Sequence, residues 1–375
     1  MNGAPAKTPR RIGVLGGGQL GRMLALSAHP LGIECLFLDP GEQSCAAAVG
    51  RRLRADYTDE AVLDALAEAT GYVTLEFENV PLAALDHLRQ RCVLRPGRAS
   101  LETAQDRLLE KRCFEALGIP VAPWAAVEEA GALPGALARV GTPCVLKSRR
   151  MGYDGKGQVM LDADSDLKAA WQQIGGRSAI VEARVALARE VSCIIARAAD
   201  GSLAFYPLSE NRHEDGILHS ARPRPDDPLA VRAMDYARRL VERLDHVGVL
   251  ALELFVSRDG ALLANEFAPR VHNSGHWSIE GASCSQFENH MRAVAGLPLG
   301  ETGLRGSSAM RNLLGSMPPA QTLLAIPGLH LHDYGKAPRP GRKVGHVTLT
   351  ADDDAQLSER ESMLDAALGS TGNQT

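Results

Sequence analysis

The sequence predicts a multidomain protein of mixed α/β and α+β class. Short β-prone runs alternate with helical periodicity in the first hundred residues, a pattern typical of a doubly wound parallel sheet. Prolines at 120 and 123 then end a helix and mark a domain boundary. Strand patterns without regular helical crossovers follow, which indicates antiparallel sheets. A chain of 375 residues also exceeds what one hydrophobic core usually organises, so we expect two or three domains.

The first domain is expected to begin with a βαβ unit. An apolar run at residues 11–15 stops at three glycines, residues 19–28 carry helical spacing, and residues 34–38 form a second strand. A third apolar run, at residues 72–75, leads into Glu76, which would therefore lie beyond the end of a strand. This part of the chain is predicted to be a nucleotide-fold domain, and a helix at residues 106–117 closes it.

A small α+β lid and a larger antiparallel region are predicted to follow. The lid strands are expected at residues 144–147, 158–161 and 179–182, with a glycine-rich loop between the first two. In the larger region, a helix at residues 228–244 is surrounded by strands expected at residues 190–197, 203–208, 249–256 and 261–267. The last part is expected to contain strands at 330–334 and 343–350, a helix near 357–368, and a disordered tail at 369–375.

Composition excludes several classes of protein. A net charge of -4 argues against a binder of nucleic acid or membrane surfaces, because both are anionic. No apolar run approaches the roughly 20 residues that span a bilayer, and the polar start of the chain predicts no secretory signal. The 7 cysteines are scattered and form no CxxC pair, which fits reduced thiols. We therefore expect a cytoplasmic protein.

The first chemical motif is GGGQLG at residues 16–21, which satisfies the pattern GxGxxG after a strand. Asp39 lies near the place of a ribose-binding acid, so this motif alone suggests NAD. The same glycines would equally suit a substrate phosphate at a helix N-terminus, or close packing.

The second motif is Lys147 followed by the loop GYDGKG at residues 152–157. Its glycines and lysines suit a flap that folds over nucleotide phosphates. The GK[ST] ending of a Walker A loop is absent. The alternative interpretation is a hairpin turn with solvated charge.

The third motif is a pair of acids, Glu253 and Glu266, each inside an apolar strand. A buried carboxylate is costly unless a cation or donor compensates it, and two on adjacent strands would bridge Mg²⁺. The alternative is the wet face of a half-exposed sheet. Arg270, His272 and Asn273 follow directly and offer donors to a phosphate or carboxylate, although a lone histidine is more often structural.

The fourth motif is a basic cluster within eleven residues near the C-terminus. Such a cluster repels itself unless an anion neutralises it, so it indicates a phosphate partner, with a solvated basic face as the alternative. Its members are Lys336, Arg339, Arg342, Lys343 and His346.

Taken in order, the motifs resemble the N5-carboxyaminoimidazole ribonucleotide synthetase family of the ATP-grasp superfamily. The resemblance runs from about residue 12 to residue 346 and rests on GGGQLGRM (16–23), EFEN (76–79), DR (106–107), MGYDGKGQ (151–158), VE (181–182), REVS (189–192), ENRHEDGI (210–217), ALELF (251–255), NEFAPRVHNSGHW (265–277) and RPGRKVGH (339–346). It implies an ATP-grasp fold with four parts: a Rossmann-like pre-ATP-grasp domain at 1–105, a linker helix and lid domain at 106–182, a catalytic domain at 183–300, and a small C-terminal subdomain at 301–375.

The resemblance also implies an activity and its site. The expected reaction is carboxylation of 5-aminoimidazole ribonucleotide with ATP and bicarbonate, through carboxyphosphate, by a homodimer that uses Mg²⁺ or Mn²⁺. The residues implied for ATP are Arg107, Lys147, Gly152, Tyr153, Asp154, Gly155, Lys156, Gly157, Gln158, Glu182, Glu190, His213, Asn265 and Glu266; for metal they are Glu253 and Glu266. Those implied for the ribonucleotide are Gly18, Gln19, Leu20, Glu76, Arg270, His272, Asn273, Lys336, Arg342 and Lys343, and the catalytic group would be Arg270, Lys147, Tyr153 and His272.

Three other functions remain open at this point. Another ATP-grasp carboxylase or formyl-transferring ligase would share the flap and the paired acids but not the RPGRKVGH segment. An NAD-dependent dehydrogenase would explain the first motif alone. A non-catalytic nucleotide-binding module would bind Mg-ATP without turning over any acceptor.

Overall fold

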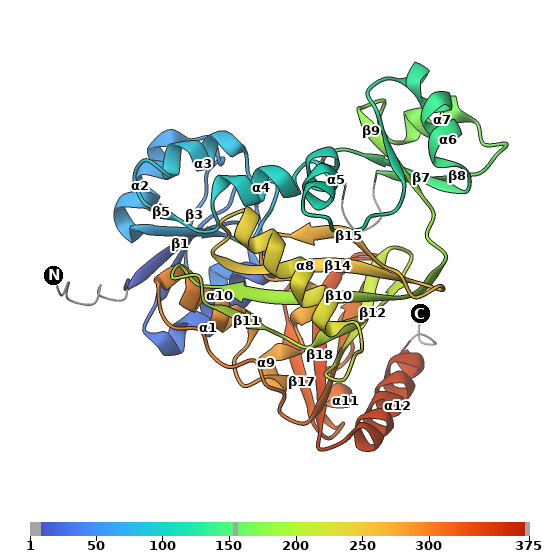
Figure 1. The fold of residues 1–375 in the computed structure, drawn as a ribbon. Coiled ribbons are helices and arrows are strands. Elements are labelled where there is room, and N and C mark those ends of the chain that lie inside the picture. The colour runs from blue at the N-terminus through green and yellow to red at the C-terminus, as the bar shows by residue number, and fades with distance from the viewer. Residues whose placement is uncertain (1–8, 153–156, 372–375) are drawn as a thin grey trace.

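The fold is known from a computed structural model, which describes residues 9–152 and 157–371. Within these residues the chain forms three β-sheets, of five, four and nine strands. Figure 1 shows the N-terminal domain and the largest sheet packed together, with the small lid projecting from them. None of the helices in this part of the chain is long and apolar enough to cross a membrane.

The N-terminal sheet is parallel and has helices on both faces, as predicted. Its strand order is β3-β2-β1-β4-β5, with β1 (Arg11–Leu15), β2 (Glu34–Leu38), β3 (Arg51–Leu53), β4 (Tyr72–Leu75) and β5 (Val93–Leu94). The helical segments are α1 (Gln19–Ala28), η1 (His29–Leu31), η2 (Cys45–Ala48), α2 (Glu60–Thr70), α3 (Leu82–Leu88) and α4 (Arg98–Ala104). The helices α2 to α4 cover one face, and α1 covers the other together with α10 (Gln286–Ala295), which comes from a distant part of the chain.

The linker helix α5 (Arg107–Ala116) leads to the lid, an antiparallel sheet with two helices against its apolar core. The lid order is β6-β9-β7-β8, and its elements are β6 (Trp124–Val127), η3 (Ala130–Ala132), α6 (Leu133–Val140), β7 (Cys144–Ser148), β8 (Gln158–Leu161), α7 (Leu167–Gln173) and β9 (Ala179–Ala183). The three predicted strands are confirmed. Strand β6 was missed because it is short and half alanine, a residue with weak β preference.

The largest sheet is antiparallel and runs in the order β15-β14-β10-β12-β13-β16-β18-β17, with β11 paired to β10. Its strands are β10 (Leu187–Arg197), β11 (Leu203–Phe205), β12 (Leu208–Glu214), β13 (Ile217–Arg224), β14 (Gly248–Ser257), β15 (Leu262–Ala268), β16 (Ser307–Leu314), β17 (Leu329–Asp333) and β18 (Lys343–Ala351). The other elements are α8 (Ala230–Arg243), η4 (Asn273–Gly275), α9 (Ser278–Gly281), α11 (Ala320–Leu324) and α12 (Asp354–Thr371).

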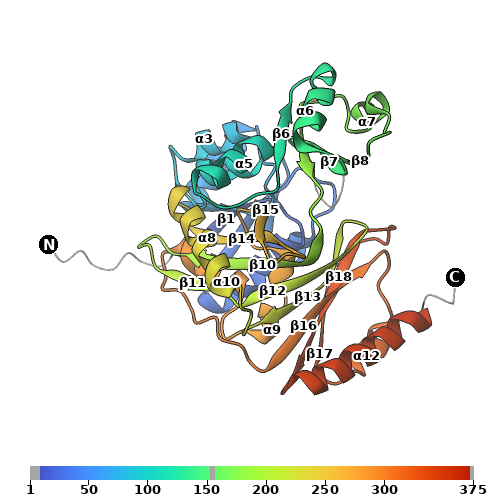
Figure 2. The same cartoon turned by 45° about the vertical axis from the view of Figure 1, so that its right-hand side comes forward.

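Helices cover both faces of this sheet, which explains the continuous apolar run at residues 193–196 of β10. On β10, Cys193 and Ile195 face the core beneath α8, whereas Ile194 and Ala196 face the core shared with α1 and α10. Alternate side chains of a strand point to opposite faces, so a strand covered on both sides reads as a continuous apolar run. Figure 2 shows α12 on the outer side of the C-terminal strands.

Several expectations for the second half of the chain were wrong. The strand expected at 203–208 is two strands, β11 and β12. Strands β12, β13 and β16 were missed because polar residues and Pro223 obscure their alternation. The C-terminal strands continue the largest sheet, although they have their own apolar core beneath α12. Helix α12 extends to Thr371, so disorder at 369–371 is not found, and residues 372–375 lie outside the described part of the chain.

Candidate active site

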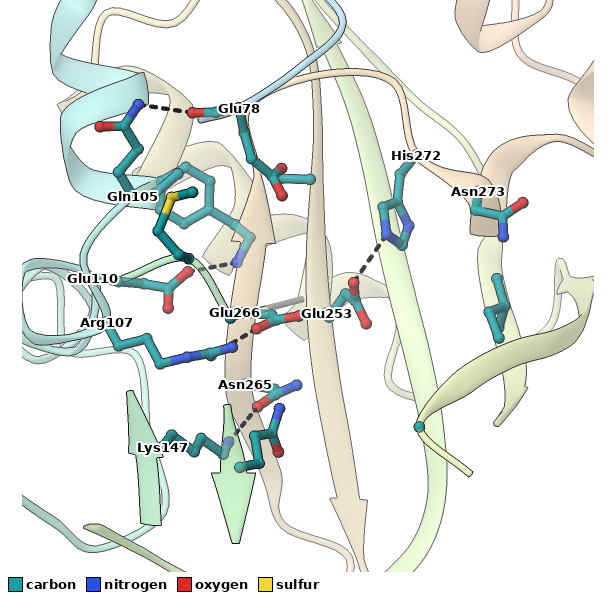
Figure 3. A pocket seen from close by; sticks show the side chains of 18 of the residues that line it. Glu78, Gln105, Arg107, Glu110, Lys147, Glu253, Asn265, Glu266, His272 and Asn273 are labelled. Carbon is teal, nitrogen blue, oxygen red and sulfur yellow. Dashed lines mark hydrogen bonds and ion pairs between the residues drawn. The ribbon is translucent and has the colours of Figure 1, made fainter. Parts of the chain in front are cut away.

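Glu253 and Glu266 lie directly opposite each other on β14 and β15. A β-bulge follows Glu253 and shifts the register of the two strands at this point. Both carboxylates line one cavity of about 290 Å³, and Lys147 enters the same cavity from the lid. Figure 3 shows the three side chains converging from the two sheets. The paired acids therefore face a common site and not the wet face of a sheet.

Each of the two carboxylates has a basic partner. Glu266 Oε2 accepts a hydrogen bond from Arg107 Nη1 at 2.7 Å, and Glu253 Oε1 lies 3.0 Å from His272 Nε2. Burial alone would raise the pKa of Glu253, but the charge and hydrogen bond of His272 lower that pKa to about 2. Glu253 is therefore ionised at neutral pH.

The two acids suit a divalent cation whose remaining ligands are phosphate oxygens and water. Among the described residues, no group of three or more His, Cys, Asp or Glu side chains is arranged to hold a metal. Mg²⁺ takes about six oxygen ligands and is usually bound by one or two carboxylates plus phosphates and water. Glu253 and Glu266 suit that mode of binding better than a closed structural site.

Lys147 lies in a buried cluster of opposite charges next to the acids. Its Nζ is 3.1 Å from Glu182 Oε1 and 3.5 Å from Asn265 Oδ1. Burial lowers the pKa of Lys147 and would raise that of Glu182, but two neighbouring lysines, Lys147 and Lys111, hold the pKa of Glu182 at about 2. The cluster places a cation at the wall of the cavity.

Other residues expected to hold ATP surround the same cavity. Gly152 and Gln158 line it at the two ends of the glycine-rich loop, and the backbone N–H of Ser148 donates to the carbonyl of Gly157 at 2.9 Å. Glu190 and His213, on neighbouring strands, also line it and lie 2.8 Å apart. Tyr153, Asp154, Gly155 and Lys156 lie outside the described residues.

A second cavity, of about 260 Å³, adjoins the first. The residues common to both are Glu78, Asn79, Arg270, His272, Asn273 and Lys343. Both amide atoms of Asn273 are buried and have no hydrogen-bond partner among the described residues. Because an unsatisfied buried amide is costly, Asn273 is prepared to bind a ligand or water at the junction of the cavities.

The glycine turn borders the second cavity, but part of its hydrogen-bonding capacity is already used. Glu76 accepts hydrogen bonds from the backbone N–H groups of Gly18 and Gly21, at 2.8 and 3.2 Å. A Cβ atom on Gly16 would lie 2.5 Å from Glu76 Oε1, and Gly16 has φ of +104°. The glycines therefore allow the turn to pack closely against Glu76. A dinucleotide pyrophosphate would need the same backbone N–H groups, which are already bonded to this carboxylate.

Known proteins similar to this chain include nucleotide-binding ligases. Three family models match: the ribonucleotide synthetase preATP-grasp domain over residues 10–105, the ATP-grasp domain over 112–287, and the phosphoribosylaminoimidazole carboxylase C-terminal domain over 308–360. The N5-carboxyaminoimidazole ribonucleotide synthase of Pseudomonas aeruginosa is 50% identical over 358 residues, which cover 96% of this chain and 99% of the relative. The chain belongs to the N5-carboxyaminoimidazole ribonucleotide synthase family. It is an ATP-grasp ligase.

Solved structures of this family share the whole fold. The enzyme of Thermus thermophilus is 50% identical, with a TM-score of 0.90 over 95% of this chain and 98% of that one. The Aspergillus clavatus synthase, in complex with ADP and 5-aminoimidazole ribonucleotide, is 30% identical, with a TM-score of 0.88 over 96% and 99% of the two chains.

The basic cluster, three of whose members the family resemblance assigned to the ribonucleotide, divides in the fold. Lys343 lines both cavities, and Lys336 donates to Gln19 Oε1 at 2.6 Å beside the glycine turn. Arg342 donates to the carbonyl of Ala337 at 3.1 Å and lines neither cavity. His346 is buried and hydrogen-bonds Tyr334 at 2.7 Å. Of the cluster, Lys343 therefore lines the cavities directly and Lys336 contacts the glycine turn through Gln19, whereas His346 is buried in the C-terminal part of the sheet.

Sequence reasoning missed four side chains of this family site. Glu78 lies 2.6 Å from Arg270, and Gln105 donates to the carbonyls of Glu78 and Val80. Glu110 accepts from the backbone of Phe267 at 2.7 Å, and burial raises its pKa to about 8. The fourth side chain is Lys111, whose Nζ lies 3.0 Å from Glu182 Oε2. The spacing of Arg107, Glu110 and Lys111 on the buried face of α5 is the signal that would have indicated two of them.

Proposed function

We propose that this chain carboxylates the amine of 5-aminoimidazole ribonucleotide with ATP and bicarbonate, in de novo purine biosynthesis. The products would be N5-carboxyaminoimidazole ribonucleotide, ADP and phosphate. The observation that carries the proposal is the junction of the two cavities. One holds the paired acids and Lys147, the other holds the glycine turn, and six residues line both. The name and the bound ligands of the Aspergillus clavatus structure support the same assignment.

The first step would be attack of a bicarbonate oxygen on the γ-phosphorus of ATP, forming carboxyphosphate and ADP. Lys147 and Arg107 would neutralise charge on the phosphoryl oxygens in transfer. Glu253 and Glu266 would hold Mg²⁺, or Mn²⁺ in its place, which when bound supplies further positive charge to the phosphates. Glu190 and His213, across the cavity, would contact the rest of the nucleotide.

The second step would bring carboxyphosphate, or the CO₂ released from it, to the amine. Arg270, His272 and Asn273 lie at the junction of the cavities and would orient the reactants there. Water would destroy carboxyphosphate, so the loop at 152–158 would also exclude solvent while it covers the phosphates. Tyr153 in this loop stays a prediction of the sequence.

An assay of acceptor-dependent ADP formation tests the proposal. The purified protein is supplied with Mg-ATP, with bicarbonate and 5-aminoimidazole ribonucleotide present or absent in all four combinations. We expect rapid ADP release only when both substrates are present. With isotope-labelled bicarbonate, one labelled carboxyl group should be transferred to the amine for each ADP formed. ADP release driven by a different amine, with none from the ribonucleotide, would instead identify another ATP-grasp ligase.

The same protein sample separates the remaining alternatives. A nicotinamide fluorescence titration should detect no tight NAD binding, because Glu76 occupies the turn. Nucleotide binding without turnover of any acceptor would identify a binding module. A cytoplasmic location and a homodimer stay predictions.

A further inference from the structure

Lys111 is a buried cation that the proposed reaction does not touch. Its side chain is 0% exposed. Its Nζ lies 3.0 Å from Glu182 Oε2 and donates to the backbone carbonyl of Asn265 at 2.8 Å. Lys111 thus joins the linker helix α5, the lid strand β9 and strand β15 of the largest sheet. Strand β9 pairs with β7, which carries Lys147 to the cavity.

The charges around Glu182 explain what Lys111 adds. Each oxygen of Glu182 has its own lysine, since Lys111 pairs with Oε2 and Lys147 with Oε1. One carboxylate cannot neutralise two ammonium groups. Lys111 is enclosed, whereas Lys147 lines the cavity, so the positive charge that exceeds the negative charge within this group of three residues is located where an anion can reach it. A surplus charge with so little water around it favours an arriving phosphate.

We propose that Lys111 is a positioning residue for nucleotide binding: it neutralises Glu182, holds Asn265, and so leaves Lys147 available to a phosphate. The inference rests on the proposed function, because the phosphate is that of the adenine nucleotide. Without Lys111, Glu182 would compete with the phosphate for Lys147, and the local potential would be more negative by one charge. Both effects weaken the binding of an anion.

The test is the affinity for ADP of Lys111→Met, which keeps the length of the side chain and removes its charge. We expect binding by titration calorimetry to weaken by about tenfold, which corresponds to about 1.4 kcal/mol. The KM for ATP should rise while the KM for 5-aminoimidazole ribonucleotide stays unchanged, because Lys111 and Glu182 are absent from the second cavity. Arg112→Met is the matched control: it removes one exposed charge from the same helix and should leave ADP affinity unchanged.

A double-mutant cycle with Glu182→Gln distinguishes positioning from a merely structural role. If Lys111 acts by neutralising Glu182, Lys111→Met should weaken ADP binding by less than about threefold in the Glu182→Gln background. An undiminished tenfold loss there would overturn the proposal. The comparison of the double variant with Glu182→Gln alone also decides the matter if Lys111→Met by itself fails to fold.

Failure of this inference is distinguishable from failure of the proposed function. Wild-type protein that binds no ADP would overturn both. Wild-type protein that binds ADP and carboxylates the ribonucleotide, together with unchanged ADP affinity in folded Lys111→Met, would overturn the role of Lys111 alone.

Discussion

The glutamates of this site differ in the direction of their pKa shifts, and the groups nearest to each carboxylate determine that direction. Glu182 is buried and Glu253 is half-buried, but lysines hold the pKa of Glu182, and His272 that of Glu253, at about 2. Burial also acts on Glu76, and there it prevails, since the backbone donors of Gly18 and Gly21 only partly oppose the rise in pKa. Glu182 and Glu253 are therefore suited to hold cations, and Glu76 is suited to hold a turn.

Glu266→Gln tests the assignment of the metal site at the level of one residue. The substitution keeps the shape of the side chain but removes the charge that would bind Mg²⁺ and that pairs with Arg107. We expect ADP formation to fall by at least about a hundredfold. The Mg²⁺ concentration required for half-maximal rate should also rise.

Thermal unfolding and a control variant complete that measurement. The unfolding temperature of Glu266→Gln should stay within a few degrees of wild type, because the carboxylate is partly exposed. Glu214→Gln, on β12 and outside both cavities, should keep the wild-type rate. A near-normal rate for Glu266→Gln would remove this residue from the metal site.

At the scale of elements, α5 connects the lid to the rest of the site. Asp106 is its N-cap and accepts from the backbone N–H of Leu108 at 3.0 Å. The same carboxylate binds Arg149 at 2.7 Å and Arg150 at 3.2 Å, where the glycine-rich loop leaves β7. The backbone N–H of Arg107 donates to the carbonyl of Arg149 at 3.0 Å. Asp106 therefore holds both the first turn of α5 and the residues at which the glycine-rich loop begins.

Asp106→Ala should destabilise the protein by about 2 kcal/mol, through the lost cap and the lost partner of two arginines. Asp106→Asn should cost less, about 1 kcal/mol, because asparagine is also a good N-cap and loses only the charge. Urea unfolding of both variants measures the difference. Equal losses would mean that the charge, and not the cap, carries the stabilisation.

At the scale of the whole molecule, two buried histidines fasten the N-terminal domain to the largest sheet. His290 Nε2 hydrogen-bonds Thr74 Oγ1 at 2.7 Å, and its Nδ1 accepts from the backbone of Val249 at 3.0 Å. His246 bonds Ser100 Oγ and the carbonyl of Val249, each at 3.0 Å. Burial lowers the pKa of His246 to about 4 and that of His290 to about 3. Both imidazoles are therefore neutral in the folded protein at neutral pH.

These lowered pKa values predict acid sensitivity. Unfolded chains take up protons on these histidines below a pKa of about 6.5, whereas the folded protein does not. The free energy of unfolding should therefore fall as pH decreases from about 6.5 towards 4, by up to about 1.4 kcal/mol per pH unit for each histidine. Above pH 6.5 the two residues should contribute no slope.

Urea unfolding between pH 7 and pH 4.5 measures this dependence in wild type, His290→Gln and His330→Gln. The slope should become shallower by about one proton in His290→Gln. His330 is exposed, so His330→Gln should keep the wild-type slope. A wild-type slope in His290→Gln would show that His290 is not the group that titrates.

What the sequence determined by itself was local structure and chemical type. The spacing at residues 11–38 predicted β1, α1 and β2, because apolar periodicity and glycine breaks act over a few residues. The order of the motifs predicted the family. Helix α10, which was not predicted from the sequence, also carried a local signal. Ser285 is its N-cap and accepts from the backbone N–H of Glu288, and Gly296 ends the helix at φ of +73°.

Only the tertiary structure decided which side chains meet. The register that sets Glu253 opposite Glu266, the use of Glu76 to fill the glycine turn, and the bond of Lys111 to Glu182 all join distant parts of the chain. Such contacts depend on strand register and on burial, which no short window of sequence contains. For the same reason Arg342 looked equivalent to Lys343 in the sequence, whereas in the fold Lys343 lines both cavities and its neighbour Arg342 lines neither.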